Sequence, residues 1–122
     1  MKSQGFSFRS RLKSFRFAME GISRFFLAEH NAWLHLIATI VVFVLAAVVG
    51  VTKNELLALV FAIGFVWVAE MFNTCIERVM DFVSNQRNSD IKFIKDLAAG
   101  AVLTAALTAL AVGAVVFIPK LF

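Results

Sequence analysis

Apolar residues fill three long stretches of the chain, and polar residues mark the breaks between them. The first stretch, AWLHLIATIVVFVLAAVVGV over residues 32–51, would span about 30 Å as an α-helix, which is the thickness of bilayer hydrocarbon. The second covers 56–83, and the third covers 97–118 and ends at Pro119. The third is rich in Ala, Gly and Thr, which let helices approach closely in lipid. The pattern predicts three transmembrane helices.

A different pattern precedes these stretches, over residues 8–27. Large apolar residues recur there at steps of three and four, and charged residues lie off that stripe. The stripe consists of Phe8, Leu12, Phe15, Met19, Ile22 and Phe26. This spacing predicts an amphipathic helix that lies in the membrane interface. Two roles stay open for it: a simple anchor on anionic lipid, or an anchor that also contributes to an active site.

The composition supports an all-α integral membrane protein. Of the 122 residues, 61% are hydrophobic and 16% are charged, and the mean hydropathy is +0.85, well above the average of soluble domains. The length predicts one domain over 1–122. No secretory signal fits the first residues, because Lys and Arg alternate with Phe there. The single cysteine, Cys75, excludes an intramolecular disulfide.

The basic residues predict an orientation in the membrane. One group precedes the first span and another lies between the second and third spans, whereas the opposite side offers Lys53 and Lys120. The two groups are Arg9, Arg11, Lys13, Arg16 and Arg24, and Arg87, Lys92 and Lys95. Because cytoplasmic loops of membrane proteins carry the excess of Lys and Arg, the N-terminus and the loop 84–96 should face the cytoplasm.

Polar residues return along one side of the second span. At about 100° per residue, Glu70, Asn73, Glu77 and Asp81 fall within roughly 80° of one another, so they share one stripe. A carboxylate within a span costs a few kcal/mol and usually marks a functional interior. If the hydrocarbon begins near Leu56, Glu70 lies about 8 Å inside it, and the next two acidic residues reach the headgroup layer.

The spacing of the carboxylates separates their predicted roles. Glu70 and Glu77 lie about 10 Å apart along the helix, too far to hold one metal ion together. A carboxylate at the membrane boundary can act as a base on a lipid hydroxyl, and one in the headgroup layer can hold Mg²⁺ on a phosphate donor. Glu29, at about the depth of Glu77, is a second candidate ligand for that ion. It could equally cap a helix start or pair with Arg24.

Two further pairs of residues give weaker signals. His30 and His35 lie about 140° apart around a helix, so they do not form a metal-binding face, and an interhelical hydrogen bond is the expected role of His35. Lys95 and Asp96, in the predicted loop before the third span, can contact a phosphate and a hydroxyl or amine. The sequence contains no Walker A loop, dinucleotide fingerprint or protein-kinase signature.

The segment EMFNTCIERVMD, residues 70–81, resembles the Glu-x-x-Asn-(Ser/Thr)-x-Ile-Glu-x-x-x-Asp signature of the prokaryotic diacylglycerol kinase family, which comprises small integral membrane lipid kinases. The segments EHNAWLH at 29–35 and KDLAAGAVL at 95–103 are similar to elements of its undecaprenol kinase branch. The resemblance implies a homotrimer with active sites shared between subunits, in a bacterial plasma membrane. Its activity would be transfer of the γ-phosphoryl of MgATP to diacylglycerol or undecaprenol at the cytoplasmic surface.

The resemblance also implies roles for individual residues. Glu70 would be the general base and would contact the lipid together with Ala99, and Glu29 and Glu77 would bind Mg²⁺ and ATP. The other implied nucleotide-binding residues are Phe17, Gln86, Arg87, Asn88, Lys95 and Asp96, with Asn73 and Asp81 in support. Phe17 stands where the family often has Tyr, and residues 86–88 replace acidic and histidine residues often found near the adenine.

Two hypotheses of other classes also fit the acidic stripe. A non-catalytic membrane subunit would use the stripe for helix assembly, would show no ATP turnover and would tolerate Glu70→Gln. A small ion or proton carrier would use its intramembrane carboxylates as a relay and would show flux in sealed vesicles without nucleotide. None of the three hypotheses involves nucleic acid.

Overall fold

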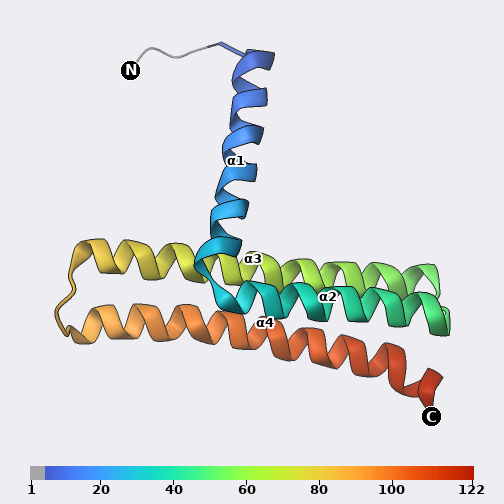
Figure 1. Ribbon diagram of the computed structural model, residues 1–122. Helices are drawn as coiled ribbons and strands as arrows, with labels where there is room; N and C mark the ends of the chain where they lie inside the picture. Colours follow the sequence, from blue (N-terminus) through green and yellow to red (C-terminus); the bar gives the residue numbers. More distant parts are fainter. Residues whose placement is uncertain (1–4) are drawn as a thin grey trace. The chain divides into compact units, whose positions relative to one another are not determined.

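The computed structural model describes residues 5–122, which form four α-helices (Figure 1). The helices are α1 (Phe8–Ala28), α2 (His30–Val49), α3 (Lys53–Val83) and α4 (Ser89–Leu121). Of these, α2, α3 and α4 are long and apolar enough to cross a membrane. The prediction of an all-α membrane protein with three spans is therefore confirmed. The chain divides into two compact units, Met1–Leu34 and His35–Phe122.

The first unit contains α1 and the first turn of α2. The predicted helix over 8–27 is present and ends at Ala28, where the backbone N–H of Glu29 donates to the carbonyl of Phe25 at 3.0 Å. Beyond Glu29, the indole Nε1 of Trp33 donates to the carbonyl of Phe26 at 3.0 Å, and the two rings meet edge to face. These contacts fix the turn from α1 into α2.

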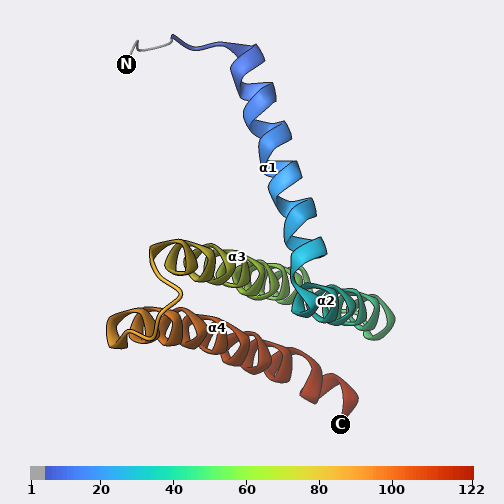
Figure 2. The ribbon, with the colours of Figure 1, turned by 60° about the vertical axis from the view of Figure 1, so that its left-hand side comes forward.

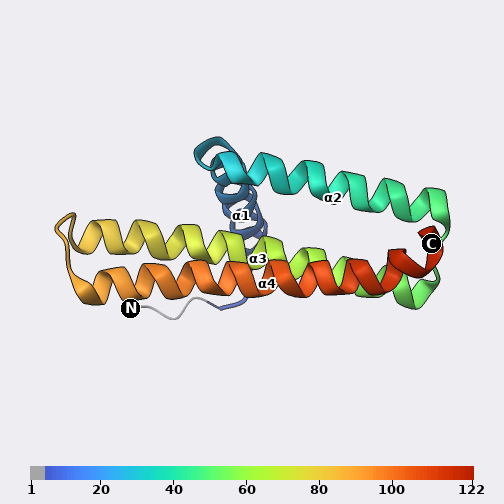
Figure 3. The same cartoon turned by 90° about the horizontal axis from the view of Figure 1, so that it is seen from below.

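In the second unit, α3 and α4 run antiparallel and side by side, joined by a short connection over 84–88 (Figures 1 and 2). The part of α2 from His35 onward runs antiparallel to α3, to which it is joined by the turn over 50–52 (Figure 3). Gly50 makes that turn possible, because its φ of 75° lies in the left-handed region that side chains with a Cβ disfavour.

The helix ends differ from those predicted over 32–51, 56–83 and 97–118. The start of α3 is at Lys53, because Thr52 and Glu55 form a capping box in which each side chain accepts from the backbone N–H of the other residue. The start of α4 is at Ser89, because the Oδ1 of Asn88 accepts from two backbone N–H groups of the first turn. Hydropathy marks the part of a helix that lies in lipid, whereas caps set where the helix begins.

Two smaller boundary corrections concern α2 and the end of the chain. The helix α2 covers His30–Val49, two residues earlier at each end than the predicted 32–51. The helix α4 continues through Pro119 to Leu121, although Pro119 was predicted to end it. A proline in the last turn removes only one backbone hydrogen bond of the helix, so the final turn can still form.

The apolar core of the second unit is small and lies at the end that holds the α2–α3 turn. Its buried residues are Ala46, Leu59, Val116 and Phe117. At the same end, the Nζ of Lys120 lies 3.1 Å from the Oε1 of Glu55, so an ion pair joins the start of α3 to the end of α4. Large apolar side chains elsewhere, such as Phe61 and Leu110, point outward and are exposed. An exposed apolar surface of this kind suits lipid or another subunit.

Candidate functional site

Glu70 is the one charged side chain that is buried in the described part of the chain, with 9% of its surface exposed. It lies near the middle of the long helix α3 and faces α2, where the Nε2 of His35 lies 2.6 Å from its Oε1. The predicted interhelical role of His35 is therefore confirmed. A carboxylate that is buried and paired in a span is typical of a functional interior.

One turn beyond Glu70, Asn73 leaves a polar atom without a partner. Its Nδ2 donates to the Oε1 of Glu77 at 3.2 Å, whereas its Oδ1 is buried and has no hydrogen-bond partner among residues 5–122. Exchanging the amide oxygen and nitrogen would place the oxygen against a carboxylate, so the orientation is fixed by charge. A buried acceptor without a partner costs about 1–3 kcal/mol. This cost points to a ligand that supplies the missing positive partner.

The oxygen atoms of Asn73 and Glu77 fit Mg²⁺, which prefers hard oxygen ligands. The described residues contain no group of three or more His, Cys, Asp and Glu side chains able to hold a metal by themselves. Glu29, the other predicted ligand, belongs to the first unit and occupies the C-cap of α1. No ion pair joins it to Arg24 within the described range.

A cavity of 630 Å³ lies at the end of the second unit that is opposite to its apolar core. It is bounded by the end of α3, the connection over 84–88 and the start of α4, and its volume is in the range of small-molecule sites. The structure brings six of the predicted site residues together in its lining. They are Asp81, Gln86, Arg87, Asn88, Lys95 and Asp96.

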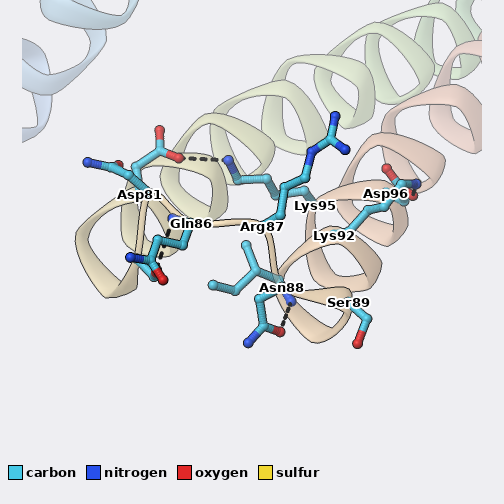
Figure 4. A pocket seen from close by; sticks show the side chains of 11 residues that line it. Asp81, Gln86, Arg87, Asn88, Ser89, Lys92, Lys95 and Asp96 are labelled. Carbon is cyan, nitrogen blue, oxygen red and sulfur yellow. Dashed lines mark hydrogen bonds and ion pairs between the residues drawn. The ribbon is translucent and has the colours of Figure 1, made fainter.

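Polar side chains dominate the lining of this cavity, and its charged members include three basic and two acidic residues. The Nζ of Lys95 on α4 lies 2.6 Å from the Oδ1 of Asp81 on α3, and the Nζ of Lys92 lies 2.5 Å from the Oδ2 of Asp96 (Figure 4). The guanidinium of Arg87 lies on the same side of the connection as the first of these pairs (Figure 4). Both lysines are thus paired with carboxylates, and Arg87 leaves the lining with an excess of one positive charge, which is compatible with an anionic ligand.

Lys95 and Asp96 were predicted in a loop, and the structure places them on α4 instead. Lys92, which was not among the predicted site residues, also lines the cavity. Its spacing of three residues from Lys95 was a signal, because residues at i and i+3 share a face once the helix is known to begin at Ser89.

Two other predicted residues are not among those that line this cavity. Phe17 belongs to α1 in the first unit, and 62% of its surface is exposed. Ala99 is exposed on α4, about one turn beyond Asp96. Their predicted roles, at the nucleotide and at the lipid, stay predictions.

Three acidic residues follow one another along the axis of α3: Glu70, Glu77 and Asp81. Glu77 lies about 10 Å beyond the buried Glu70, and Asp81 lies about 6 Å further, at the rim of the cavity. The second unit thus places the buried carboxylate of Glu70, the polar pair of Asn73 and Glu77, and a polar cavity one after another along α3. This arrangement suits a reaction between an apolar and a water-soluble anionic substrate.

Comparison with known proteins gives the family. The model of the family described as prokaryotic diacylglycerol kinase matches residues 16–117. A diacylglycerol kinase of Synechocystis sp. (strain ATCC 27184 / PCC 6803 / Kazusa) is 33% identical over 111 residues, which are 90% of this chain but 63% of that protein. An undecaprenol kinase of Bacillus subtilis (strain 168) is 32% identical over 109 residues, 89% of each chain. The chain belongs to the prokaryotic diacylglycerol kinase family.

Proposed function

We propose that the protein is a lipid kinase that transfers the γ-phosphoryl of ATP to the hydroxyl of a membrane lipid. The observation that carries the proposal is the polar face of α3, which runs from the buried Glu70 to the polar cavity at Asp81. The family and the two relatives support the same chemistry. One of these relatives is described as a diacylglycerol kinase and the other as an undecaprenol kinase, so the acceptor is proposed as one of these two lipid alcohols.

The length of α3 supports a reaction at the membrane surface. Its 31 residues extend about 46 Å, whereas hydrocarbon is about 30 Å thick. If the span begins near the start of α3, Glu70 lies within the hydrocarbon close to its edge, and about the last three turns project into the headgroup layer. The cavity then faces water, where ATP is available. The excess of basic residues on this side supports a cytoplasmic location.

In this proposal Glu70 is the general base. As the lipid hydroxyl oxygen attacks the γ-phosphorus, Glu70 accepts the hydroxyl proton, and ADP leaves with the electrons of the broken P–O bond. The exposed surface of Ala99, on the side of α4 beyond the cavity, is proposed to contact the lipid. Phosphoryl transfer depends mainly on positioning and charge stabilisation, so a single base and fixed substrates are sufficient.

The residues at the rim are proposed to bind the nucleotide. Lys95 and Arg87 would contact the phosphates, while Asp96, Gln86 and Asn88 would accept from or donate to the rest of the nucleotide. Phe17 is proposed to contact the nucleotide from α1.

Glu77, Asn73 and Glu29 are proposed to hold Mg²⁺ on the ATP phosphates, where the ion would neutralise their negative charge. The unpartnered Oδ1 of Asn73 supports this assignment.

Two structural features of the proposal concern assembly. The helix α1 would lie in the membrane interface with its apolar stripe toward lipid, since Phe8, Leu12 and Phe15 are exposed. The outward apolar surface of α2, α3 and α4, together with the small residues of α4, would be covered in part by a homotrimer. Mass measurement of the purified protein in detergent tests the trimer.

The test of function is transfer of radiolabelled phosphate from ATP by the purified protein in mixed micelles. Diacylglycerol and undecaprenol are offered separately, with Mg²⁺ and with a chelator, beside the Glu70→Gln variant. We expect Mg²⁺-dependent transfer to one of the two lipids and loss of turnover in the variant. If folded protein transfers phosphate to neither lipid, the lipid kinase proposal is wrong and the non-catalytic subunit becomes the better hypothesis.

A further inference from the structure

The pair formed by His35 and Glu70 joins two helices inside the membrane-spanning part of the second unit. The Nε2 of His35 lies 2.6 Å from the Oε1 of Glu70, a distance at which an N–H on Nε2 can donate to the carboxylate. The contact occupies Oε1 and leaves Oε2 as the second acceptor of the carboxylate. His35 retains 29% of its side-chain surface and Glu70 12%, so this contact is shielded from solvent.

His35 is itself held by a chain of hydrogen bonds. The Nε1 of Trp67 on α3 donates to the Oγ1 of Thr39 on α2 at 3.0 Å. The hydroxyl of Thr39 in turn donates to the carbonyl of His35 at 2.7 Å. A hydroxyl has one hydrogen to donate and lone pairs to accept, so both bonds can form together.

The rings of His35 and Trp67 also pack together. Their centroids lie 6.1 Å apart at an interplanar angle of 64°, an edge-to-face contact. Trp67 precedes Glu70 by about one turn on α3, and Thr39 follows His35 by one turn on α2. These contacts join one face of α2 to one face of α3: the hydrogen bonds reach the backbone of His35, and the ring of Trp67 packs against its imidazole.

The carboxylate of a general base needs such a support in this environment. A glutamate has three rotatable side-chain bonds, and burial makes an unpaired carboxylate costly. A partner on one oxygen holds the side chain in a single conformation and keeps the other oxygen available to a substrate hydroxyl. Catalytic groups are effective when neighbouring contacts hold them in the productive geometry.

We propose that His35 is a positioning residue for phosphoryl transfer: it holds Glu70 through Oε1 so that Oε2 faces the lipid hydroxyl, while Thr39 and Trp67 hold His35. The inference rests on the proposed function, in which Glu70 is the base. The inference adds that the conformation of the Glu70 side chain depends on α2 as well as on α3. Neither the ATP site nor the lipid chains need contact His35 for this role.

The test compares three variants of His35 in the micelle assay with the full chain. Gln places an amide nitrogen near the position of Nε2, Asn carries the same amide on a shorter side chain that falls short of Glu70, and Leu has no donor. We expect kcat to fall by about tenfold or more in His35→Asn and His35→Leu. This loss is smaller than the full contribution of a general base, because Glu70 is still present but less well positioned. The KM values for MgATP and lipid should stay within about twofold, and His35→Gln should keep at least about a third of kcat.

Two outcomes would overturn the inference. Equal kcat losses in His35→Gln and His35→Asn would show that His35 acts by ring packing alone, and raised KM with normal kcat would place it at a substrate. The variants His35→Gln and His35→Asn both carry an amide, so their comparison is valid even if His35→Leu does not fold. Size-exclusion chromatography in detergent verifies the folding of each variant.

A double substitution separates this inference from the proposed function. If His35 acts through Glu70, adding His35→Asn to Glu70→Gln should lower kcat no further, because the second change removes support from a base that is already absent. Additive losses would contradict the inference while leaving the lipid kinase proposal intact. Full turnover of the Glu70→Gln variant would show that Glu70 is not the general base. That result would contradict both the role assigned to Glu70 and this inference about His35.

Discussion

Lys95 on α4 and Asp81 on α3 form an ion pair across the connection between the two helices, with Nζ 2.6 Å from Oδ1. The side chains are 37% and 58% exposed, and ion pairs with this much exposure contribute about 1 kcal/mol or less to stability. The pair therefore stabilises the fold little, and it leaves a cation at the wall of the cavity that a phosphate can recruit.

Substitution of Lys95 by Met tests this role in nucleotide binding. We expect the KM for MgATP to rise by about tenfold or more, as loss of one hydrogen bond to a charged group predicts. The unfolding temperature should fall by no more than a few degrees, because the pair is exposed and contributes about 1 kcal/mol or less. Lys53→Met, at the opposite end of α3, is the matched control and should keep the wild-type KM. An unchanged KM for MgATP in Lys95→Met would show that Lys95 does not bind the nucleotide.

Glu70 and Glu77 should fail in different ways when each is replaced by Gln. Glu70→Gln removes the base, so we expect kcat to fall by about 10²–10⁴-fold with little change in nucleotide binding. Glu77→Gln should instead weaken Mg²⁺-dependent binding of the nucleotide. Steady-state kinetics and direct titration of MgATP distinguish the two. Equal losses of ATP affinity would contradict this division of roles.

The substitution Asn73→Leu should raise the Mg²⁺ requirement of the activity with little change in the stability of the fold. The substitution removes the buried Oδ1 that has no partner in the described structure, which offsets the loss of the hydrogen bond to Glu77. We expect the free energy of unfolding to stay within about 1 kcal/mol of the wild type, while the Mg²⁺ concentration for half-maximal activity rises by about tenfold. Denaturation in micelles and a Mg²⁺ titration measure the two quantities. A normal Mg²⁺ requirement would show that Asn73 is not a ligand.

The capping box at the start of α3 should affect stability alone. Thr52→Ala removes the side chain that accepts from the backbone of Glu55, and loss of such a cap costs about 1 kcal/mol. We expect the unfolding temperature in detergent to fall by a few degrees, while kcat at low temperature is unchanged because Thr52 lies at the end opposite to the cavity. Thr52→Ser keeps the hydroxyl and should behave like the wild type. A large loss of kcat in Thr52→Ala would show that the two ends are coupled.

The apolar stretches were sufficient to predict the three spans, and the period of the acidic stripe was sufficient to place Glu70 and Asp81 on one face of α3. The start of α4 differs from the predicted one, although Asn88 is an N-cap residue type, because hydropathy marks only the part of a helix that lies in lipid. The contact between His35 and Glu70 needs more than a pattern. It depends on the rotation of α2 relative to α3, which no periodicity within one helix determines.

The continuity of α3 from Lys53 to Val83 has a consequence for how the protein can vary. In an unbroken helix, each added residue changes both the depth of the following side chains in the membrane and their direction around the helix axis. One residue inserted between Asn73 and Glu77 would move the end of α3 by about 1.5 Å and turn it by about 100°, away from the partners of Asp81. An insertion of a whole turn would restore the direction of Asp81 but would still move it by about 5.4 Å along the axis. The number of residues between Glu70 and Asp81 therefore fixes both their distance and their relative direction.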